Sequence, residues 1–368
     1  MKACIVTYDE YINIPYVKDY EALLRENGIQ FDIILWNRSE KRGADGFSGD
    51  KAFVFNWRTK QSKFSKLLPF YLWRKSVIKI LHENCYDFLI ICTTMPGVLI
   101  VDILTKLYNG KYLIDIRDYT YEFFWPYRDA VKKTILSSGI TLISSRGFLE
   151  WLPCGGIERY VITNNITNTD PAASCKIARD KSPLVIGFVG GIRYYDVNKK
   201  IVDAFANNAL FSLLYVGKKH PGCDLAEYCE RHGISNVSFL PPYNNEDKRR
   251  IYESVDIINC IYGDDNLEVR TSVSNKLYDC ALYKTPILVS KNTYISKIVE
   301  EYNLGLSVDI KEDNVSALLV DYLDCFNKNA FLEGCARFLD MSLSEKNAAL
   351  KSVGAFFENY SEKAKTRT

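Results

Sequence analysis

Short apolar runs alternate with longer helical patterns along most of this 368-residue chain, and this alternation constrains the fold more than any other feature. In the first half, seven segments are typical of strands: 3–7, 31–36, 52–56, 88–92, 112–116, 141–144 and 160–163. Helical patterns fall between them at 16–27, 67–84, 97–108, 127–138 and 145–151. Strands that alternate with helices form βαβ units, and such units build a parallel sheet. We therefore expect an α/β fold.

A second series of the same kind follows a segment, 169–183, that is rich in Pro, Asn and Ser and has no periodicity. Its predicted strands are 184–189, 213–216, 237–240, 257–261, 287–289 and 305–308. A chain of 368 residues is long enough for two hydrophobic cores. We expect two tandem Rossmann-like, doubly wound domains, 1–168 and 184–340, joined by the linker 169–183 and followed by a helical segment, 341–368.

The composition is that of a soluble globular protein, with 47% hydrophobic and 25% charged residues. A net charge of +2 argues against a nucleic-acid partner. The 11 cysteines form no C-x-x-C pair and the 3 histidines have no metal-ligand spacing, so we expect neither a disulfide framework, a metal site nor a cofactor. No apolar run approaches the roughly 18 residues of a membrane span, which favours a cytoplasmic protein.

The segment from Ser274 to Val289 carries the clearest chemical signal. Ser274 is a good N-cap for a short helix, and the free backbone N–H groups of Asn275, Lys276 and Leu277 would form an anion site at its positive end. Asp279 follows within the same helix, where its carboxylate could accept hydrogen bonds from ribose hydroxyls. A diphosphate site beside a ribose acceptor is the physical description of a nucleotide-sugar pocket.

Ligands of doubly wound sheets bind at the carboxyl ends of the strands, so residues just after each strand are further candidates. Gly190 and Gly191 would let the backbone approach phosphate oxygens, and Arg193 could neutralise them; a tight turn with a surface arginine is the alternative. Lys218 is a second phosphate candidate, although it could equally be a solvated lysine. Tyr243 could stack on the nucleobase or simply pack on its own domain.

The segment from Ser274 to Pro286 resembles the C-terminal half-site of retaining GT-B glycosyltransferases of the family-4 type, whose signature is Pro/Ser-x-Lys-Leu-x-Glu-x-x-Ala-x-Gly-Lys-Pro. Asp279 stands where that family has its second glutamate, and Arg193 where it has the arginine that binds the donor diphosphate. The resemblance implies two Rossmann-like domains with a cleft between them. It also implies metal-independent transfer of a hexose from a nucleotide-diphosphate sugar, UDP-linked by preference, with the donor as substrate and no cofactor.

One part of the family signature is missing. The family's first glutamate, which addresses the sugar, precedes the second by seven residues, and this chain has Ser272 there. Glu268, eleven residues before Asp279, and Asp264 are the neighbouring carboxylates that could replace it. A solvated acidic loop is the alternative for each.

In the first domain, Asp115-Ile116-Arg117-Asp118 ends a predicted strand and resembles the acceptor-side loop of bacterial polysaccharide glycosyltransferases of this family. If the enzyme inverts the anomeric configuration, Asp118 is the expected base. Pairing of Arg117 with either carboxylate is the structural alternative. The resemblance implies a saccharide or undecaprenyl-linked acceptor in capsule, O-antigen or exopolysaccharide assembly.

Residues 51–82 contain eight Lys or Arg residues and no acidic residue, interleaved with aromatic side chains. This composition is typical of a segment that binds an anionic membrane surface, which would place the protein on the inner face of the plasma membrane; a core-packed helix with a basic face is the alternative. Two other functions remain open: a nucleotide-sugar 2-epimerase of the same fold, and a catalytically silent nucleotide-sugar-binding partner.

Overall fold

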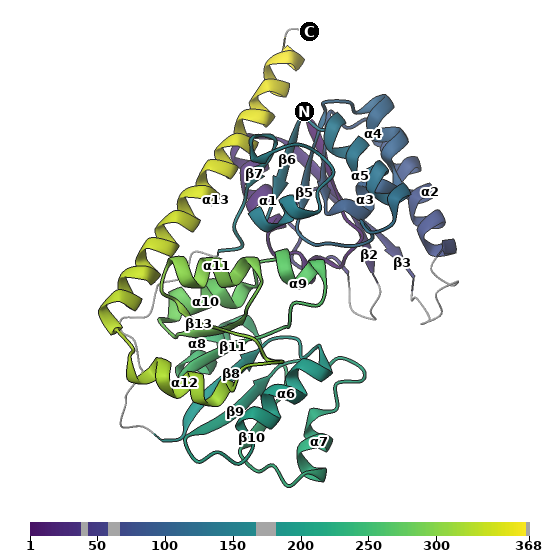
Figure 1. Cartoon of the computed structure of the whole chain (residues 1–368). Helices are drawn as coiled ribbons and strands as arrows, with labels where there is room; N and C mark the ends of the chain where they lie inside the picture. The colour runs from purple at the N-terminus through teal and green to yellow at the C-terminus, as the bar shows by residue number, and fades with distance from the viewer. Residues whose placement is uncertain (38–42, 58–66, 167–181, 366–368) are drawn as a thin grey trace. The chain divides into compact units, whose positions relative to one another are not determined.

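A computed structural model describes residues 1–37, 43–57, 67–166 and 182–365 of the chain (Figure 1). It divides into two compact units. The first unit comprises Met1–Asn164 together with Glu345–Thr368, and the second comprises Asn165–Ser344. The predicted linker, 169–183, lies almost entirely outside the described residues.

The first unit is built on a seven-stranded parallel sheet with the order β3-β2-β1-β4-β5-β6-β7. Its strands are β1 (Lys2–Val6), β2 (Gln30–Asn37), β3 (Lys51–Asn56), β4 (Phe88–Cys92), β5 (Tyr112–Ile116), β6 (Ile140–Ile143) and β7 (Val161–Ile162). Every residue of β4 and β5 is buried, because helices cover both faces of the sheet. This burial explains why the central strands are continuous apolar runs rather than alternating patterns.

The helices of the first unit connect these strands in sequence. They are η1 (Tyr11–Asn13), α1 (Val17–Glu26), α2 (Leu67–Asn84), α3 (Thr94–Leu99), α4 (Val101–Leu107), α5 (Trp125–Ser137), η3 (Arg146–Glu150) and η4 (Ile157–Arg159). The long helix α13 (Lys328–Lys365) also contributes to this unit, since Ala349, Val353 and Phe357 are buried in its core. The ring of Phe357 stacks on Phe88 of β4, with their centroids 5.0 Å apart.

The second unit has a six-stranded parallel sheet with the order β10-β9-β8-β11-β12-β13. Its strands are β8 (Leu184–Val189), β9 (Phe211–Val216), β10 (Val237–Leu240), β11 (Ile257–Cys260), β12 (Ile287–Ser290) and β13 (Gly305–Val308). Its helices are α6 (Tyr195–Phe205), α7 (Leu225–Arg231), η5 (Asn245–Asp247), α8 (Lys248–Glu253), α9 (Leu267–Thr271), α10 (Asn275–Tyr283), α11 (Tyr294–Glu301) and α12 (Val315–Asp324). The strand order reverses between β8 and β11, which is the topological switch point of this sheet.

The predicted α/β class is confirmed, and each predicted strand is present with its ends shifted by at most two residues. The helices needed more correction. The single helix predicted over 97–108 is two helices, α3 and α4, because Ile100 leaves the helical region with φ −122° and ψ 24°. The helix predicted over 145–151 is the 3₁₀ helix η3, whose N-cap residue Ser145 accepts from the N–H of Gly147 through its hydroxyl.

Two groups of side chains differ in their burial. The ten described cysteines are free, and eight of them are buried, whereas Cys85 and Cys325 are exposed. Within 51–82, Trp73 is fully buried and Phe70 packs edge-on against Trp36 at 5.3 Å, so part of the aromatic content of this segment belongs to the core. Residues 58–66 of that segment lie outside the described residues.

Candidate functional site

The predicted donor residues of the second unit follow β10, β9, β8 and β11, four adjacent strands of its sheet. Gly190 begins the loop after β8 with φ +131°, and its N–H donates to the carbonyl of Val216 at 2.8 Å. Gly217, just after β9, has φ +140°. A Cβ on Gly217 would lie only 2.0 Å from the carbonyl oxygen of Gly190, so only glycine fits there. The ends of β8 and β9 are therefore joined by backbone contact, directly beside the switch point between β8 and β11.

The same two loops continue to pair beyond the glycines. The N–H of Ile192 donates to the carbonyl of Lys218 at 2.9 Å, and the N–H of His220 donates to the carbonyl of Ile192 at 3.1 Å. This pairing brings the His220 ring beside Gly191, with Nε2 3.3 Å from the position that a Cβ on Gly191 would occupy. Burial and the positive charges of Arg193 and Lys218 lower the pKa of His220. The loops thus gather three cationic or protonatable side chains beside Gly191.

Lys276 adds a buried cation from the first turn of α10. Its side chain is 5% exposed, and its ammonium lies 4.0 Å from the centroid of the Phe188 ring and donates to the Tyr262 hydroxyl. The Nζ atom is 3.7 Å from the position of a Cβ on Gly190. Among the described residues no carboxylate lies within ion-pair distance of this ammonium, and the same holds for Arg193 and Lys218. The site therefore carries positive charge that no carboxylate among the described residues neutralises by an ion pair.

The helix that carries Lys276 begins as predicted. Ser274 is the N-cap residue, with extended backbone angles (φ −70°, ψ 143°), and its hydroxyl accepts from the N–H of Lys276 at 3.4 Å. Asn275 is exposed in the first turn, whereas Leu277 is fully buried in the core. The N–H of Leu277 also donates within this turn, to the Ser274 carbonyl at 3.0 Å, so the expectation that the N–H groups of Lys276 and Leu277 are free is wrong. The helix dipole still adds a partial positive charge at this end of α10.

Asp279 lies in the middle of α10 and is 4% exposed. One carboxylate oxygen contacts the Lys248 ammonium at 2.6 Å, and the other accepts from the Tyr252 hydroxyl at 2.8 Å. Each oxygen retains a second lone pair, so a further hydrogen bond is chemically available. Tyr243 lies near Asp279, half-buried against the hydrophobic core, and burial together with this carboxylate raises its pKa to about 12.

The three candidates for the missing glutamate have different surroundings. Asp264 forms an ion pair with Lys311 at 3.0 Å and accepts from Asn292 at 3.3 Å, and the Lys311 contact lowers its pKa. Ser272 is the residue directly after α9, at its C-cap position. Glu268, in the first turn of α9, is half-buried with no ion pair among the described residues. After burial, its charge is the main cause of the raised pKa of Tyr194, in the loop after Arg193.

In the first unit, Arg117 pairs with Asp115, which is the structural alternative considered for this loop. Arg117 is 9% exposed and donates from Nε to Asp115 at 2.9 Å, while its guanidinium stacks over the Tyr16 ring at 4.2 Å. The Tyr20 hydroxyl donates to the same Asp115 oxygen at 2.6 Å. Asp118 is the exposed member of the loop, at the carboxyl end of β5.

Sequence reasoning missed a second acidic residue of this loop. Glu122 is 3% exposed, and burial raises its pKa. Its carboxylate accepts from the Thr94 hydroxyl at 2.8 Å and from the N–H of Thr120 at 2.5 Å. No motif spacing marks Glu122 in the sequence, because its partners come from β4 and β5 ends that only the sheet order brings together.

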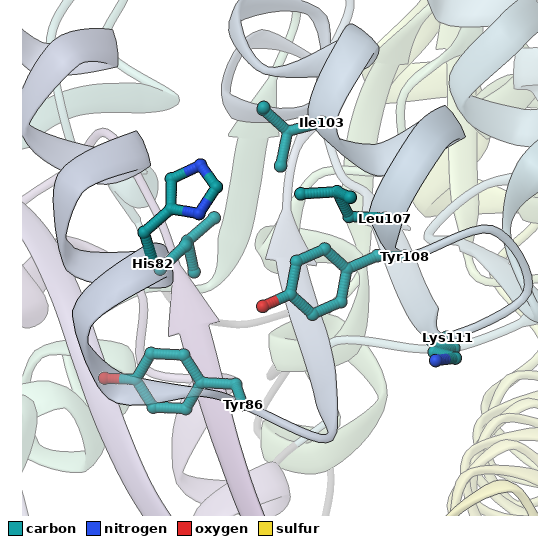
Figure 2. Close-up of a pocket in the computed structure, with 7 residues that line it drawn as sticks. His82, Tyr86, Ile103, Leu107, Tyr108 and Lys111 are labelled. Carbon is teal, nitrogen blue, oxygen red and sulfur yellow. The ribbon is translucent and has the colours of Figure 1, made fainter.

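A cavity of about 160 Å³ lies elsewhere in the first unit (Figure 2). It opens between α2 and α4 and is lined by residues of both helices and by Tyr86, Tyr108 and Lys111. Tyr86 and Lys111 precede β4 and β5, so the cavity is at the amino ends of the strands. It is therefore separate from the predicted ligand-binding edge. In the described part of the chain, no group of three His, Cys, Asp or Glu side chains is arranged to hold a metal ion.

No family model and no curated protein matches this chain. Solved structures do match over nearly its full length. A sucrose-phosphate synthase from Thermosynechococcus elongatus superposes with a TM-score of 0.72 at 11% identity, covering 100% of both chains. Anabaena HepE in complex with UDP and glucose gives 0.69 at 14% identity, covering 96% of this chain and 100% of its own. The lipopolysaccharide outer core galactosyltransferase WaaB gives 0.66 at 13% identity, covering 96% and 99%.

These identities are low, so the likeness establishes the fold and not the activity. The two parallel sheets with alternating helices match the GT-B architecture of two Rossmann-like domains. The fold expected from the resemblance is confirmed.

Proposed function

Because the chain has the GT-B fold, we propose that it is a glycosyltransferase that moves a hexose from a nucleoside diphosphate sugar to a saccharide acceptor. The observation that carries the proposal is the set of three cations, Arg193, Lys218 and Lys276, without carboxylate partners among the described residues around Gly190. Such a set fits a diphosphate, whose two charged phosphates would supply the missing negative charge. HepE, a protein of similar fold, is described with bound UDP, which favours a UDP-linked donor.

The donor would bind with its diphosphate against the Gly190 loop and the N-terminus of α10. Gly190 and Gly191 would allow the backbone to approach the phosphates closely. Arg193 and Lys218 would contact the phosphates from the protein surface, and the buried Lys276 would contact them from the interior side. These groups would stabilise the negative charge that develops on the leaving diphosphate in the transition state. The fixed cation of Lys276 is already desolvated, so little reorganisation accompanies the reaction.

The nucleoside would extend toward Asp279 and Tyr243, which lie near each other on the same unit. Asp279 would accept from the ribose hydroxyls through its remaining lone pairs, while Lys248 and Tyr252 hold the carboxylate in place. Glu268 is the carboxylate we assign to the donor sugar, because Asp264 is already neutralised by Lys311. It would thus replace the glutamate that the sequence lacks seven residues before Asp279.

The transfer would retain the anomeric configuration, with the leaving diphosphate oxygen accepting the proton of the acceptor hydroxyl on the same face. In that case no separate base is needed. If the product is inverted instead, Asp118 is the base to test, since it is the exposed carboxylate at the carboxyl end of β5. The stereochemistry of the product measured by NMR separates the two mechanisms.

The acceptor would be a saccharide or an undecaprenyl-linked saccharide in bacterial surface polysaccharide assembly, such as capsule or O-antigen. WaaB, named as a lipopolysaccharide outer core galactosyltransferase, is one of the proteins of similar fold and supports this class of acceptor. The enzyme would act in the cytoplasm at the inner face of the plasma membrane. None of the helices in the described residues is both long and apolar enough to span a bilayer.

The test is donor binding and turnover with a panel of UDP-, GDP- and dTDP-sugars. We expect one nucleotide class to stabilise the protein thermally and to be slowly hydrolysed to free nucleotide. Arg193→Ala and Lys276→Met should each lower donor affinity about 10- to 100-fold, since each removes a charged contact. Lys219→Met is the matched control, because Lys219 already pairs with Asp224.

If Lys276→Met and Lys219→Met bound the donor with equal affinity, Lys276 would not belong to the donor site. Binding without nucleotide release would favour the silent binding protein. Conversion of the donor sugar to its 2-epimer would instead identify an epimerase.

A further inference from the structure

Exposed apolar side chains are concentrated on one part of the first unit. Twelve large hydrophobic residues are exposed among the described residues, and eight of them belong to α2, α4, α5 or the loop that precedes α5. These eight, which we call the α2–α5 face, are Leu68, Tyr71, Leu107, Tyr121, Phe123, Phe124, Trp125 and Leu136. Isolated exposed apolar residues are ordinary, but a cluster of this kind marks an interaction surface.

The three helices that carry this face are neighbours in one layer (Figure 1). Arg74 of α2 forms a two-pronged contact with Asp102 of α4, with both N···O distances 2.8 Å. The cavity of Figure 2 lies between the same two helices. Helix α4 in turn packs against α5. The exposed residues of the three helices therefore face the solvent from one continuous layer.

Apolar and basic side chains share the outer stripe of these helices. On α5, Trp125, Arg128, Lys132 and Leu136 are all exposed and follow one another at spacings of three and four residues, which places them on one side of the helix. On α2, Leu68 and Tyr71 are followed by exposed Lys75 and Lys79 at the same spacing. Aromatic or aliphatic groups next to cations on one helix stripe are typical of a helix that lies in a lipid interface.

Four exposed aromatic residues lie just before and at the start of α5, and we call them the aromatic tip: Tyr121, Phe123, Phe124 and Trp125. Contacts at its base hold this tip in place. Glu122 is clamped by the Thr94 hydroxyl and the Thr120 N–H at its buried side. Tyr121 packs edge-on against Tyr127 at 5.8 Å. Phe123 and Trp125 nevertheless remain 74% and 76% exposed. Exposed aromatic rings on a segment that is held rigidly are suited to insertion into another surface.

The net charge of helices α2, α4 and α5 indicates what kind of surface this face would bind. Helices α2, α4 and α5 contain seven Lys or Arg and three Asp or Glu residues, although the whole chain has a net charge of only +2. All three acidic residues are already paired, Asp102 with Arg74, Asp129 with Lys133 and, at a longer 3.8 Å, Glu83 with Lys79. The unpaired excess is therefore positive, which complements a negatively charged surface.

We propose that the α2–α5 face docks peripherally on an anionic lipid bilayer. The aromatic tip would enter the headgroup region while Lys75, Lys79, Arg128 and Lys132 contact lipid phosphates. The inference deepens the proposed function and rests on it for its purpose, since it names the surface that would reach a membrane-bound acceptor. It changes the sequence prediction in one respect: the docking surface takes only the outer stripe of α2 from residues 51–82 and gains α4, α5 and the loop before α5.

The test is sedimentation of the full-length protein with vesicles of phosphatidylcholine alone or with about 30% phosphatidylglycerol. We expect binding to the anionic vesicles only, weakened by salt. Phe123→Ser with Trp125→Ser should reduce binding about tenfold or more, and Arg128→Gln with Lys132→Gln should remove most of the salt dependence. Leu210→Ser with Leu240→Ser, two exposed apolar residues of the second unit, is the matched control.

Nucleotide binding and the melting temperature are measured on the same variants, so failure of the docking surface is distinguished from failure of the donor site. No sedimentation of the wild type with anionic vesicles would overturn the proposal, as would equal binding by the aromatic variant. A dimer that is lost in Trp125→Ser, without vesicle binding, would overturn it in favour of a second copy of the chain.

Discussion

His220 shows how one residue can acquire a function from its neighbours. It belongs to no motif, yet loop pairing brings its ring beside Gly191 and near Arg193 and Lys218. These cations and burial keep its pKa below the usual 6.5, so the ring is neutral in the free protein near neutral pH. A bound diphosphate would offset the two cations and raise this pKa again.

Donor binding should therefore take up a proton at His220. We expect the affinity for a UDP-sugar, whose diphosphate has no group that titrates near neutral pH, to increase about two- to fivefold from about pH 8 to about pH 6. His220→Gln should abolish this increase, and calorimetry at several pH values measures it. His232→Gln is the control, since His232 contacts the Tyr228 carbonyl instead. An unchanged pH dependence in His220→Gln would exclude its role.

The same lowered pKa has a consequence for folding. Because the native state disfavours the protonated ring, the unfolded chain binds more protons as the pH falls below 6.5. The contribution of His220 to stability is thus present above pH 6.5 and is lost as the pH decreases from 6.5 through the lower pKa of the folded state.

At the scale of elements, the ends of β8 and β9 depend on one close contact. Gly217 allows its strand end to lie against the Gly190 carbonyl, and a Cβ there would be 2.0 Å from that oxygen. Gly217→Ala must therefore separate the two strand ends or force the residue into a strained conformation. We expect the free energy of unfolding to fall by about 2–4 kcal/mol, the sum of backbone strain and steric displacement.

Gly233→Ala is the matched control for this variant. Gly233 also has a positive φ, +62°, but nothing lies within 4 Å of its added Cβ. It should cost only the backbone term, about 1 kcal/mol. Urea unfolding measures both variants. Equal losses would mean that the Gly190 contact is dispensable, whereas a larger loss in Gly217→Ala with weakened nucleotide binding would link the contact to the donor site.

At the scale of the whole molecule, α13 supplies part of the core of the first unit although most of that unit precedes it by 180 or more residues in the chain. Phe357 is fully buried and stacks on Phe88. Phe357→Ala should destabilise the first unit by about 3–5 kcal/mol, because it leaves a cavity beside the sheet. The second unit does not contain this contact.

Calorimetry of Phe357→Ala should therefore show the first unit unfolding at a lower temperature, while the nucleotide-induced stabilisation of the second unit persists. Val320→Ala, a half-buried change in the second unit, is the control and should leave the first unit unaffected. A single transition that is lowered as a whole would contradict the assignment of separate cores.

The amino-acid sequence by itself determined the strands, the two-domain α/β class and the cap of α10. These features depend on local information: continuous apolar runs mark buried parallel strands, and Ser274 stabilises the helix that follows it directly. The resemblance of the segment around Asp279 to a known family correctly indicated the GT-B fold, because that segment is contiguous in the chain.

Only the tertiary structure decided which side chains meet. The neighbour relation of β9, β8 and β11 brings Lys276 against Phe188 and His220 against Gly191, although these pairs are far apart or unmarked in the sequence. Likewise, Trp73 is buried in the core whereas Trp125 is exposed. The composition of the sequence cannot distinguish these two tryptophans. Proximity and exposure follow from strand order and packing, and these are properties of the whole fold rather than of any local segment.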